Sequence, residues 1–439
     1  MNRRTFLEKG TLLSATPCVM RHLSAAPGKQ AADSIGLGFI GLNGIGTANL
    51  VSALASTNTR LVAIADIDQG VIDKRMREFE GKGLKPKVYT DFRKLLEDKE
   101  VDAVVINTPD HWHTLMVAMA LEAGKHVYVE KPLANTVSEC LYLEKAANQY
   151  NKLKVQVGQQ QRSAPHWADA MAYLHGGALG RIRQAKAWVY VGWKGAVPVK
   201  ADEPVPAGVN YDMWLGPAPL RPFNINRFHF TFRWYWEYAG GLMTDWGVHM
   251  LDMALMGMKA KAPKSVVAMG GKFAYPDDAQ QTPDTMQTLY NFGDTLLSWE
   301  HSLGVALGPY ERTNGVAFTG ENGTLIADRS GWKVVSEIGG DRGKTVYKMP
   351  LLPERRAQSD GRNEHFANWF KAIREGTPLA CPIADASQVA MVAHLGNLAL
   401  RSGQNVTWND AKKQVEGNPE AQKLSQHRYR APWVLPKLA

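Results

Sequence analysis

The sequence has few cysteines, no long apolar run and no local concentration of charge. Its 439 residues include only three cysteines, which predict no disulfide framework. No uninterrupted apolar run reaches the roughly 18 residues that a membrane-spanning helix needs. Lysine and arginine are scattered among the acidic residues, so the net charge of +9 forms no patch for nucleic acid. We therefore expect no membrane span and no nucleic-acid partner, and the 45% apolar composition allows two ordinary cores.

Residues 1–33 differ from the rest of the chain. Arg3 and Arg4 precede a short, weakly apolar stretch, and the small Ala25 and Ala26 suit a cleavage site. This pattern resembles a twin-arginine export signal, so we expect a signal and linker over 1–33 and an exported, periplasmic protein. A lipidated cysteine is expected to follow a small residue. Pro17 precedes Cys18 instead, which disfavours a lipid anchor. The alternative is an ordinary basic N-terminus.

A glycine-rich turn follows the apolar run of residues 35–40 and precedes a helical pattern from Gly44 to Leu54. Glycines permit a tight turn and a close backbone approach, and the N–H groups of a helix start attract a pyrophosphate. Asparagine occupies the usual place of the second glycine, and it tolerates positive φ better than most residues. The turn therefore predicts a dinucleotide site formed by Gly41, Asn43, Gly44, Ile45 and Gly46.

An acidic residue follows the next predicted strand at the spacing of a ribose-binding group. That strand runs from Arg60 to Ala65, and Asp66 lies twenty residues after Gly46. A carboxylate accepts hydrogen bonds from the ribose hydroxyls and repels a 2′-phosphate. NAD is therefore favoured over NADP.

Strands and helices continue to alternate up to residue 158, which predicts parallel βαβ units. We expect a Rossmann dinucleotide-binding domain over 34–158. Two strand ends within it carry polar groups to the rim of the sheet, where ligands of open α/β sheets bind. The residues expected to contact the cofactor there are Asn107, Thr108, Pro109, His113, Glu130 and Lys131.

The second half changes to alternating strand patterns, with runs such as Ile182–Val191, Met286–Phe292 and Val316–Ala327. These predict an α+β substrate domain over 159–410 with a mostly antiparallel, open-faced sheet. Helical patterns at 365–375 and 386–401 are expected to pack against the first domain. Residues 411–439 form a C-terminal extension, for which an arm on a neighbouring subunit is one interpretation.

Asp245 and His249 are four residues apart in a predicted helix that begins near Gly240. On one helix face, the carboxylate could orient the imidazole or tune its charge. Two other interpretations remain open: a core helix with a buried, satisfied histidine, or a pair of metal ligands. No further ligand cluster accompanies the pair, so we expect no metal.

An aromatic segment lies upstream of this helix, between residues 224 and 238. Aromatic rings with polar edges suit sugars, whose C–H faces stack and whose hydroxyls need directional partners, although the same rings also fill cores. The candidate substrate contacts are Arg162, Arg227, His229 and Tyr235.

The glycine turn, Asp66, Asn107-Thr108-Pro109 and Glu130-Lys131-Pro132, in this order and spacing, resemble the Gfo/Idh/MocA oxidoreductase family over residues 35 to about 410. The resemblance implies the two-domain fold above and an enzyme that oxidises or reduces sugars, inositols or related polyols. It further implies that Lys131, Asp245 and His249 are the catalytic set, and that subunits associate as dimers or tetramers through the open sheet face.

Export and a nicotinamide cofactor together predict that NAD stays tightly bound, because free NAD is not expected outside the cytoplasm. We therefore expect an NAD-dependent oxidoreductase that acts on a sugar, glycoside or polyol. One alternative is a redox-neutral glycoside hydrolase or lyase that works through a transient keto sugar, as related members of the family do. The other is a noncatalytic sugar-binding protein on a dehydrogenase scaffold.

Overall fold

The computed structural model describes residues 34–340 and 345–439. The predicted export signal therefore lies outside the described residues. A first sheet of six parallel strands has the order β3-β2-β1-β4-β5-β6. Its strands are β1 (Ile35–Ile40), β2 (Thr59–Ala65), β3 (Lys87–Tyr89), β4 (Ala103–Ile106), β5 (His126–Val129) and β6 (Val155–Val157). The helices between them are α2 (Ile45–Leu54), α3 (Gln69–Glu80), α4 (Phe92–Glu97), α5 (Asp110–Glu122) and α6 (Val137–Gln149).

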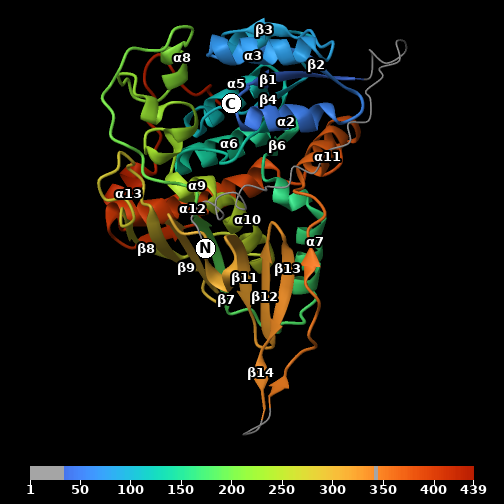
Figure 1. Cartoon of the computed structure of the whole chain (residues 1–439), viewed down its shortest axis with the longest axis vertical. Coiled ribbons are helices and arrows are strands. Elements are labelled where there is room, and N and C mark those ends of the chain that lie inside the picture. The colour runs from blue at the N-terminus through green and yellow to red at the C-terminus, as the bar shows by residue number, and fades with distance from the viewer. Residues whose placement is uncertain (1–33, 341–344) are drawn as a thin grey trace, which may run out of the picture. The chain divides into compact units, whose positions relative to one another are not determined.

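Both faces of this sheet are buried, as a parallel sheet requires. On β4, Val104 and Ile106 join the apolar cluster formed with α4, α5 and α6, while Val105 joins the cluster on the opposite face with α2 and α3. The strand sequences are therefore continuously apolar, and the predicted Rossmann fold is confirmed. Figure 1 shows these strands among their helices.

The strand order reverses between β1 and β4. The chain leaves β1 toward β2 on one side, and returns to β4 on the other side of β1. Ligands of open α/β sheets bind in the crevice that such a reversal opens at the carboxyl ends of the strands. Gly41 and Asn107 directly follow these two strands and flank that crevice.

A second sheet has ten strands in the order β16-β13-β12-β11-β7-β10-β9-β8-β17-β18, and only β7 and β10 pair in parallel. Its strands are β7 (Gln184–Val191), β8 (Ser265–Gly271), β9 (Thr285–Asn291), β10 (Leu296–Leu303), β11 (Asn314–Thr319), β12 (Gly323–Asp328), β13 (Gly331–Ser336), β16 (Arg355–Arg356), β17 (Val406–Asn409) and β18 (Gln414–Glu416). A separate hairpin pairs β14 (Ile338–Gly339) with β15 (Val346–Tyr347). The mostly antiparallel sheet was predicted, but the single run expected over 316–327 is two strands joined by a turn at Gly320.

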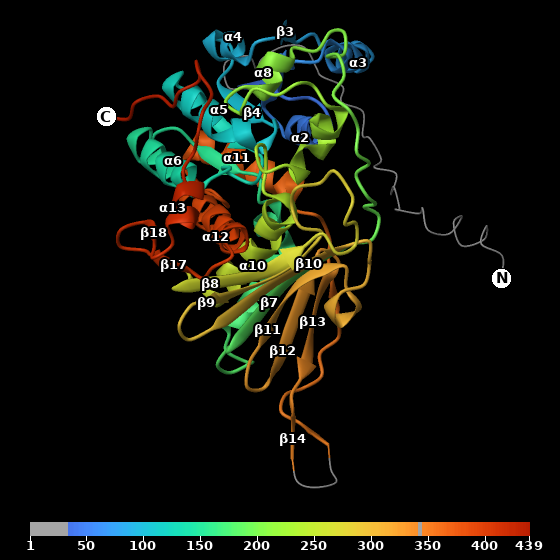
Figure 2. The same cartoon turned by 90° about the vertical axis from the view of Figure 1, so that its left-hand side faces the viewer.

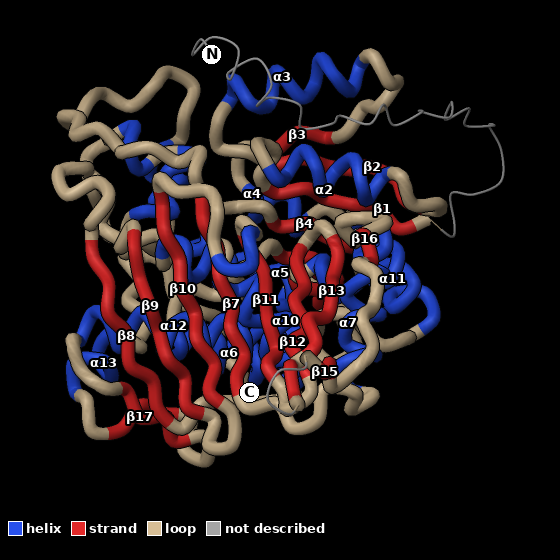
Figure 3. Tube along the Cα trace, turned by 60° about the horizontal axis from the view of Figure 1, so that its bottom comes forward, coloured by secondary structure: helices blue, strands red, loops and turns tan. Residues whose placement is uncertain are grey.

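Helices cover one face of this sheet. The helices of the second half are α7 (Pro165–His175), α8 (Tyr211–Leu215), α9 (Gly241–Asp245), α10 (Gly247–Met258), α11 (Arg362–Glu375), α12 (Ile383–Ser402) and α13 (Pro419–Leu424). Short 3-10 helices are η1 (Gln160–Ser163), η2 (Ile225–Arg227), η3 (His229–Trp234) and η4 (Pro309–Glu311). Apolar residues of α10 and α12 form one core with the inward side chains of the strands, and Figure 3 shows the strands in front of these helices. No helix in the described part of the chain is long and apolar enough to cross a membrane.

Helix α11 returns to the first sheet, as its apolar spacing predicted. Phe366, Trp369 and Phe370 are fully buried against the β1 face, where Phe366 stacks on Tyr128 with ring centroids 4.3 Å apart. Figure 1 shows α11 beside α2. The first sheet is therefore completed by a helix that lies about 200 residues later in the chain.

The C-terminal segment packs on its own chain. Tyr142 of α6 donates a hydrogen bond to the carbonyl oxygen of Pro436, and Trp433 lies edge-on to Trp112 of α5 with ring centroids 4.9 Å apart. Figure 2 shows the segment running beside α5 and α6. The arm on a neighbouring subunit stays a prediction, because these contacts lie within one chain. The boundary expected at 410 falls inside the hairpin of β17 and β18.

Candidate active site

The glycine turn forms a cradle at the crevice between β1 and β4. Gly41 has a φ of 82°, and a Cβ there would lie 2.9 Å from the carbonyl oxygen of Asn107. A Cβ on Gly46 would lie 2.3 Å from the carbonyl oxygen of Gly41, so both positions require glycine. Gly44 has a φ of 52° with open space around it at the start of α2. Asn43 does not adopt a positive φ, because the neighbouring glycines provide it, and its Oδ1 instead accepts a hydrogen bond from Gly44 N.

Asp66 lies beside this cradle at the end of β2. Its Oδ2 accepts a hydrogen bond from the backbone N–H of Leu42 at 2.8 Å, which ties the carboxylate to the turn. Burial raises its pKa, and the backbone hydrogen bonds from Leu42 and Asp68 oppose that rise. The predicted ribose-binding group therefore lines the same cavity as the glycines.

A buried asparagine that the sequence did not single out connects three strand ends. Asn49 of α2 donates hydrogen bonds to Asn107 Oδ1 and Glu130 Oε1, both at 2.8 Å. Asn107 in turn donates to the carbonyl oxygen of Gly41, and Glu130 accepts from the backbone N–H of Lys131. Glu130 and Asn107 therefore hold the turn and the lysine in position, in addition to lining the cavity.

The catalytic candidates Lys131 and Asp245 meet in an ion pair. Lys131 Nζ lies 2.6 Å from Asp245 Oδ1 and 2.9 Å from its carbonyl oxygen. Arg233, which the sequence analysis missed, has its Nε 3.4 Å from the same carboxylate oxygen. Burial opposes ionisation of Asp245, but the charges of Lys131 and Arg233 outweigh it and lower its pKa to about 2. Asp245 is therefore an ionised counter-ion for two cations.

His249 lines the same cavity and has only 6% of its surface exposed. Burial and the charges of Arg329, Lys131 and Arg362 lower its pKa well below the usual value, so the imidazole is neutral. Its Nδ1 is buried without a partner among the described residues, which leaves Nε2 as the nitrogen that can face the cavity. The predicted helix is interrupted at Trp246, and no hydrogen bond within residues 34–340 and 345–439 joins Asp245 to His249. Asp245 was expected to orient the imidazole or tune its charge. Burial and the nearby cations lower the pKa of His249 instead.

Asp110 is a second carboxyl group at this end of the cavity that sequence reasoning missed. It opens α5 directly after Thr108-Pro109, and only 7% of its surface is exposed. Burial raises its pKa to about 7, against the opposing charges of Arg233 and Lys131. A carboxyl group with such a pKa can exchange a proton near neutral pH. The sequence feature that could have identified Asp110 is its position directly after the predicted Thr108-Pro109.

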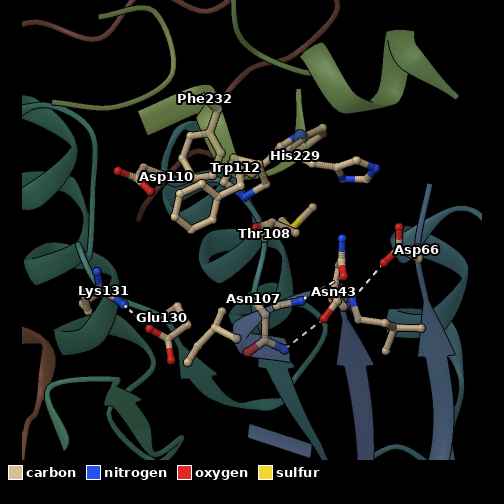
Figure 4. Close-up of a pocket in the computed structure, with 18 of the residues that line it drawn as sticks. Asn43, Asp66, Asn107, Thr108, Asp110, Trp112, Glu130, Lys131, His229 and Phe232 are labelled. Atoms are coloured by element: carbon tan, nitrogen blue, oxygen red, sulfur yellow. Dashed lines mark hydrogen bonds between the residues drawn. The ribbon is translucent and has the colours of Figure 1, made fainter. Parts of the chain in front are cut away.

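Figure 4 shows how these groups are distributed along the cavity, which has a volume of about 520 Å³. Lys131 and Glu130 lie at one end, Asp66 lies at the other, and Asn107 and Asn43 lie between them. Aromatic side chains complete the walls. Phe230 and Phe232 come from the predicted aromatic segment, whereas Trp112, Trp214 and Trp246 lie outside it.

The structure does not bring Arg162 to this cavity. Its guanidinium forms two hydrogen bonds of 2.9 Å from Nε and one of 2.7 Å from Nη2 to the carboxylate of Asp252, which is fully buried, and it also bonds Asp385. The expectation of a substrate contact is corrected: Arg162 is a structural ion-pair partner. Sequence could not show this, because Asp252 lies 90 residues away.

Other expected contacts are also distributed differently. Arg227 packs over Tyr235 and pairs with Asp202 at 3.7 Å, and neither Arg227 nor Tyr235 lines the cavity. His229 does line it, but its Nε2 lies 2.9 Å from Asp68, and Figure 4 shows it on the side of Asp66. His229 is thus at the nucleotide end.

His113 lies behind the cavity wall. Its ring nitrogens lie 2.7 and 2.8 Å from the carbonyl oxygens of Pro132 and Thr108, so it can only position the loops that hold the cofactor.

The cavity fits a dinucleotide and offers no metal cluster within the described residues. The glycine positions leave room that side chains would fill, the start of α2 faces this space, and Asp66 supplies the ribose acceptor. A family model described as an oxidoreductase family with an NAD-binding Rossmann fold matches residues 35–159. The model for the C-terminal alpha/beta domain of the same family matches residues 182–301, so the two cover more than half of the chain.

The chain belongs to the Gfo/Idh/MocA oxidoreductase family. The matched N-terminal domain makes NAD its cofactor. Curated relatives include a glycosyl hydrolase family 109 protein of Shewanella pealeana, 33% identical over 175 residues, and an alpha-N-acetylgalactosaminidase of Shewanella oneidensis, 36% identical over 121 residues. The matches cover 35% and 26% of this chain, and only 38% and 26% of the length of those relatives.

Solved structures agree in fold over a much longer region. A levoglucosan dehydrogenase in complex with NADH and levoglucosan superposes with a TM-score of 0.64 at 21% identity, covering 85% of this chain and 99% of that one. GenD2 from gentamicin A biosynthesis, in complex with NAD, gives a TM-score of 0.63 at 20% identity, covering 88% and 99%. The likeness in fold therefore extends over most of this chain.

Proposed function

We propose that this Gfo/Idh/MocA protein uses NAD to oxidise a hydroxyl group of a sugar, glycoside or polyol. The observation that carries the proposal is the 2.6 Å ion pair of Lys131 and Asp245, which lines one cavity with the glycine turn and a neutral His249. A cation that polarises an oxygen and an imidazole that accepts its proton are the groups that this reaction needs. The sugar dehydrogenases of similar fold make sugars the first substrate class to test.

Lys131, Asp245 and His249 each have a separate role in the proposed reaction. When bound, NAD supplies the hydride acceptor for the carbon that carries the hydroxyl. Lys131 donates a hydrogen bond to the hydroxyl oxygen and stabilises the negative charge that develops there. Asp245 holds the ammonium group in place through two hydrogen bonds. His249 accepts the hydroxyl proton at Nε2, and its lowered pKa keeps the imidazole neutral at neutral pH, as a proton acceptor must be.

A second candidate is net cleavage of a glycoside without net oxidation. Oxidation of one ring hydroxyl to a ketone acidifies the adjacent C–H bond, so a base can remove that proton and the glycosidic substituent can leave. Water then adds, and the hydride returns to the ketone. Two observations favour this candidate: the relatives named as glycosyl hydrolases, and Asp110, whose pKa of about 7 suits protonation of a leaving group.

We also propose that the protein is exported with NAD tightly bound. The basis is the Arg3-Arg4 pattern and the small residues near Ala25. The twin-arginine route carries folded proteins, so NAD can be loaded before export. Fractionation of cells that express the full chain tests this proposal, and the Arg3→Lys, Arg4→Lys double variant is the matched control. Equal recovery of both forms from the periplasm contradicts it.

Homo-oligomers are proposed to form through the uncovered face of the ten-stranded sheet. Apolar side chains are exposed there on β8 and β9, with 83% exposure for Met269, 46% for Val267 and 44% for Leu289. Contiguous exposed apolar surface of this kind commonly marks an interface. Light scattering of the wild type against Met269→Lys measures the assembly, and an unchanged monomer mass for both contradicts it.

One experiment separates the catalytic candidates. Protein purified without added cofactor is denatured, and the released nucleotide is identified by mass spectrometry. Native protein is then mixed with sugars and p-nitrophenyl glycosides while absorbance is followed at 340 nm for reduced cofactor and at 400 nm for nitrophenolate. A lasting rise in absorbance at 340 nm identifies net oxidation. Release of nitrophenolate without such a rise identifies redox-neutral cleavage. Sugar binding with neither signal would indicate a noncatalytic scaffold.

A further inference from the structure

The cavity wall beside His249 carries two arginines that the proposed reaction does not use. Lys131 and Arg233 share Asp245 as their counter-ion, at 2.6 and 3.4 Å. Arg329 and Arg362 line the same cavity, and the charges of both lower the pKa of His249, so they lie close to the proposed base. Their role is therefore separate from that of the ion pair.

Arg329 is held in place without a carboxylate partner. Its Nε donates a hydrogen bond to Gln161 Oε1 at 3.1 Å, and its guanidinium stacks on Trp246 at 4.3 Å from the ring centroid. No acidic oxygen of residues 34–340 or 345–439 lies within 4.0 Å of it, and no hydrogen bond from its Nη groups is present among them. The side chain is thus oriented by neutral groups while its outer N–H donors remain available.

The acidic residue next to Arg329 is engaged elsewhere. Asp328 ends β12, and its Oδ1 lies 2.8 Å from Nη1 of Arg312 and accepts the backbone N–H of Ser330 at 2.7 Å. This arrangement fixes the turn that carries Arg329 and leaves the guanidinium uncompensated. A partly buried charge without a counter-ion is costly. Burial and the charge of nearby Arg362 indeed lower the pKa of Arg329 to about 10, against the opposing charge of Asp245.

Arg362 completes a two-arginine site. It begins α11, and its only acidic neighbour in the described part of the chain is Asp360 at 3.6 Å, whose side chain is 61% exposed. Guanidinium groups pair with carboxylates in a planar, bidentate geometry that neutral sugars cannot satisfy. Arg329 and Arg362 line one cavity near His249, and together they present a receptor for an anion.

We propose that the substrate is an acidic sugar or glycoside, a hexuronic acid, whose carboxylate binds Arg329 and Arg362 while its reacting hydroxyl lies between Lys131 and His249. This rests on the proposed function of the same site. The pyrophosphate of the cofactor has its own receptor in the glycine turn, at the end of β1 in the first sheet. Arg329 instead follows β12 of the second sheet, so it belongs to the substrate wall.

The test uses the full-length protein with NAD bound and matched substrate pairs. The probes are the p-nitrophenyl α- and β-glucuronides and galacturonides against the corresponding glucosides and galactosides. We expect kcat/KM to be about 100-fold higher for the acidic member of at least one pair, because the neutral member leaves the arginines unpaired. Arg329→Gln and Arg362→Gln are expected to reduce this preference at least tenfold.

Arg355→Gln is the matched control. Arg355 also stacks on a tryptophan, Trp332, at 5.0 Å, but it lies on the exposed surface and pairs with Asp169. It is expected to keep the wild-type preference. Calorimetric titration with glucuronate, glucose and glucose 6-sulfate measures binding without turnover, and equal affinity for sulfate and carboxylate would overturn the assignment to a uronic acid.

The possible failures are distinguishable. Turnover of neutral sugars that equals or exceeds that of every acidic partner overturns this inference and leaves the proposed function intact. Absent turnover with Arg329-dependent binding of glucuronate supports the anion site and overturns the proposed function. A tenfold loss of NAD affinity in Arg329→Gln assigns the arginine to the cofactor and overturns the inference.

Discussion

Lys131 Nζ lies 2.6 Å from Asp245 Oδ1, although 114 residues separate the two in the chain. The lysine follows β5 of the parallel sheet, and the aspartate ends α9 beside the antiparallel sheet. Their ion pair therefore joins the cofactor half of the cavity to the substrate half. The proposed reaction depends on this ion pair, because Asp245 holds the lysine that polarises the substrate hydroxyl.

Replacement of the lysine tests its catalytic role. Lys131→Ala removes the cation that stabilises charge on the substrate oxygen, and turnover is expected to fall about 10³-fold. The glycine turn and Asp66 remain, so the NAD content of the purified protein should stay near that of the wild type. Single-turnover absorbance at 340 nm and mass spectrometry of released nucleotide measure the two effects. Full turnover in this variant contradicts the assignment.

The carboxylate of Asp66 is expected to set the preference for NAD. Asp66→Ser keeps a hydrogen-bond acceptor and removes the charge that repels a 2′-phosphate, so the affinity ratio of NADP to NAD should rise at least tenfold, or about 1.4 kcal/mol. Fluorescence titration of nucleotide-free protein with each cofactor measures this. Asp73→Ser, at an exposed carboxylate of α3 that bonds Gln69, is the control. An unchanged ratio in Asp66→Ser assigns the preference to other residues.

The raised pKa of Asp110 predicts a pH-dependent stability. Because its pKa is about 7 in the folded protein and 3.8 in the reference state, the folded state binds the extra proton between these values. The contribution of Asp110 to stability is therefore greatest below pH 3.8 and is lost as the pH rises to 7. Asp110→Asn does not titrate, so relative to wild type it should gain up to about 4 kcal/mol between pH 4 and pH 8. Urea unfolding of nucleotide-free protein at several pH values checks this, and a constant difference between the two proteins rejects the shifted pKa.

The corrected role of Arg162 predicts a loss of stability rather than of sugar affinity. Arg162→Ala leaves the fully buried Asp252 without its counter-ion and should cost about 3–5 kcal/mol of unfolding free energy. Arg355→Ala, which breaks an exposed pair, should cost about 1 kcal/mol or less. Denaturant unfolding compares them. A stable Arg162→Ala protein with weakened sugar binding would restore the original interpretation of a substrate contact.

Local sequence determined the cofactor half of this protein. The glycine turn, Asp66 and Lys131 each follow a strand, and parallel βαβ units bring strand ends to one edge of a sheet by rules that act over a few tens of residues. Glycine at positions 41 and 46 is required by backbone geometry alone, which is why these positions could be recognised without a structure. The Asp245 and His249 pair was also visible, because both residues lie in one short segment.

Tertiary structure decided the charges and most of the substrate wall. Arg233 and Arg329 carry no local signal of their function, and the only local signal of Asp110 is its place after Thr108-Pro109. The charge states of all three depend on burial and on partners from distant segments. Arg162 lies outside the site for the same reason: it pairs with the carboxylate of Asp252, which lies 90 residues away in the sequence. Spacing along the chain specifies backbone turns and strand ends, whereas desolvation and counter-ions exist only once the two sheets enclose a common cavity.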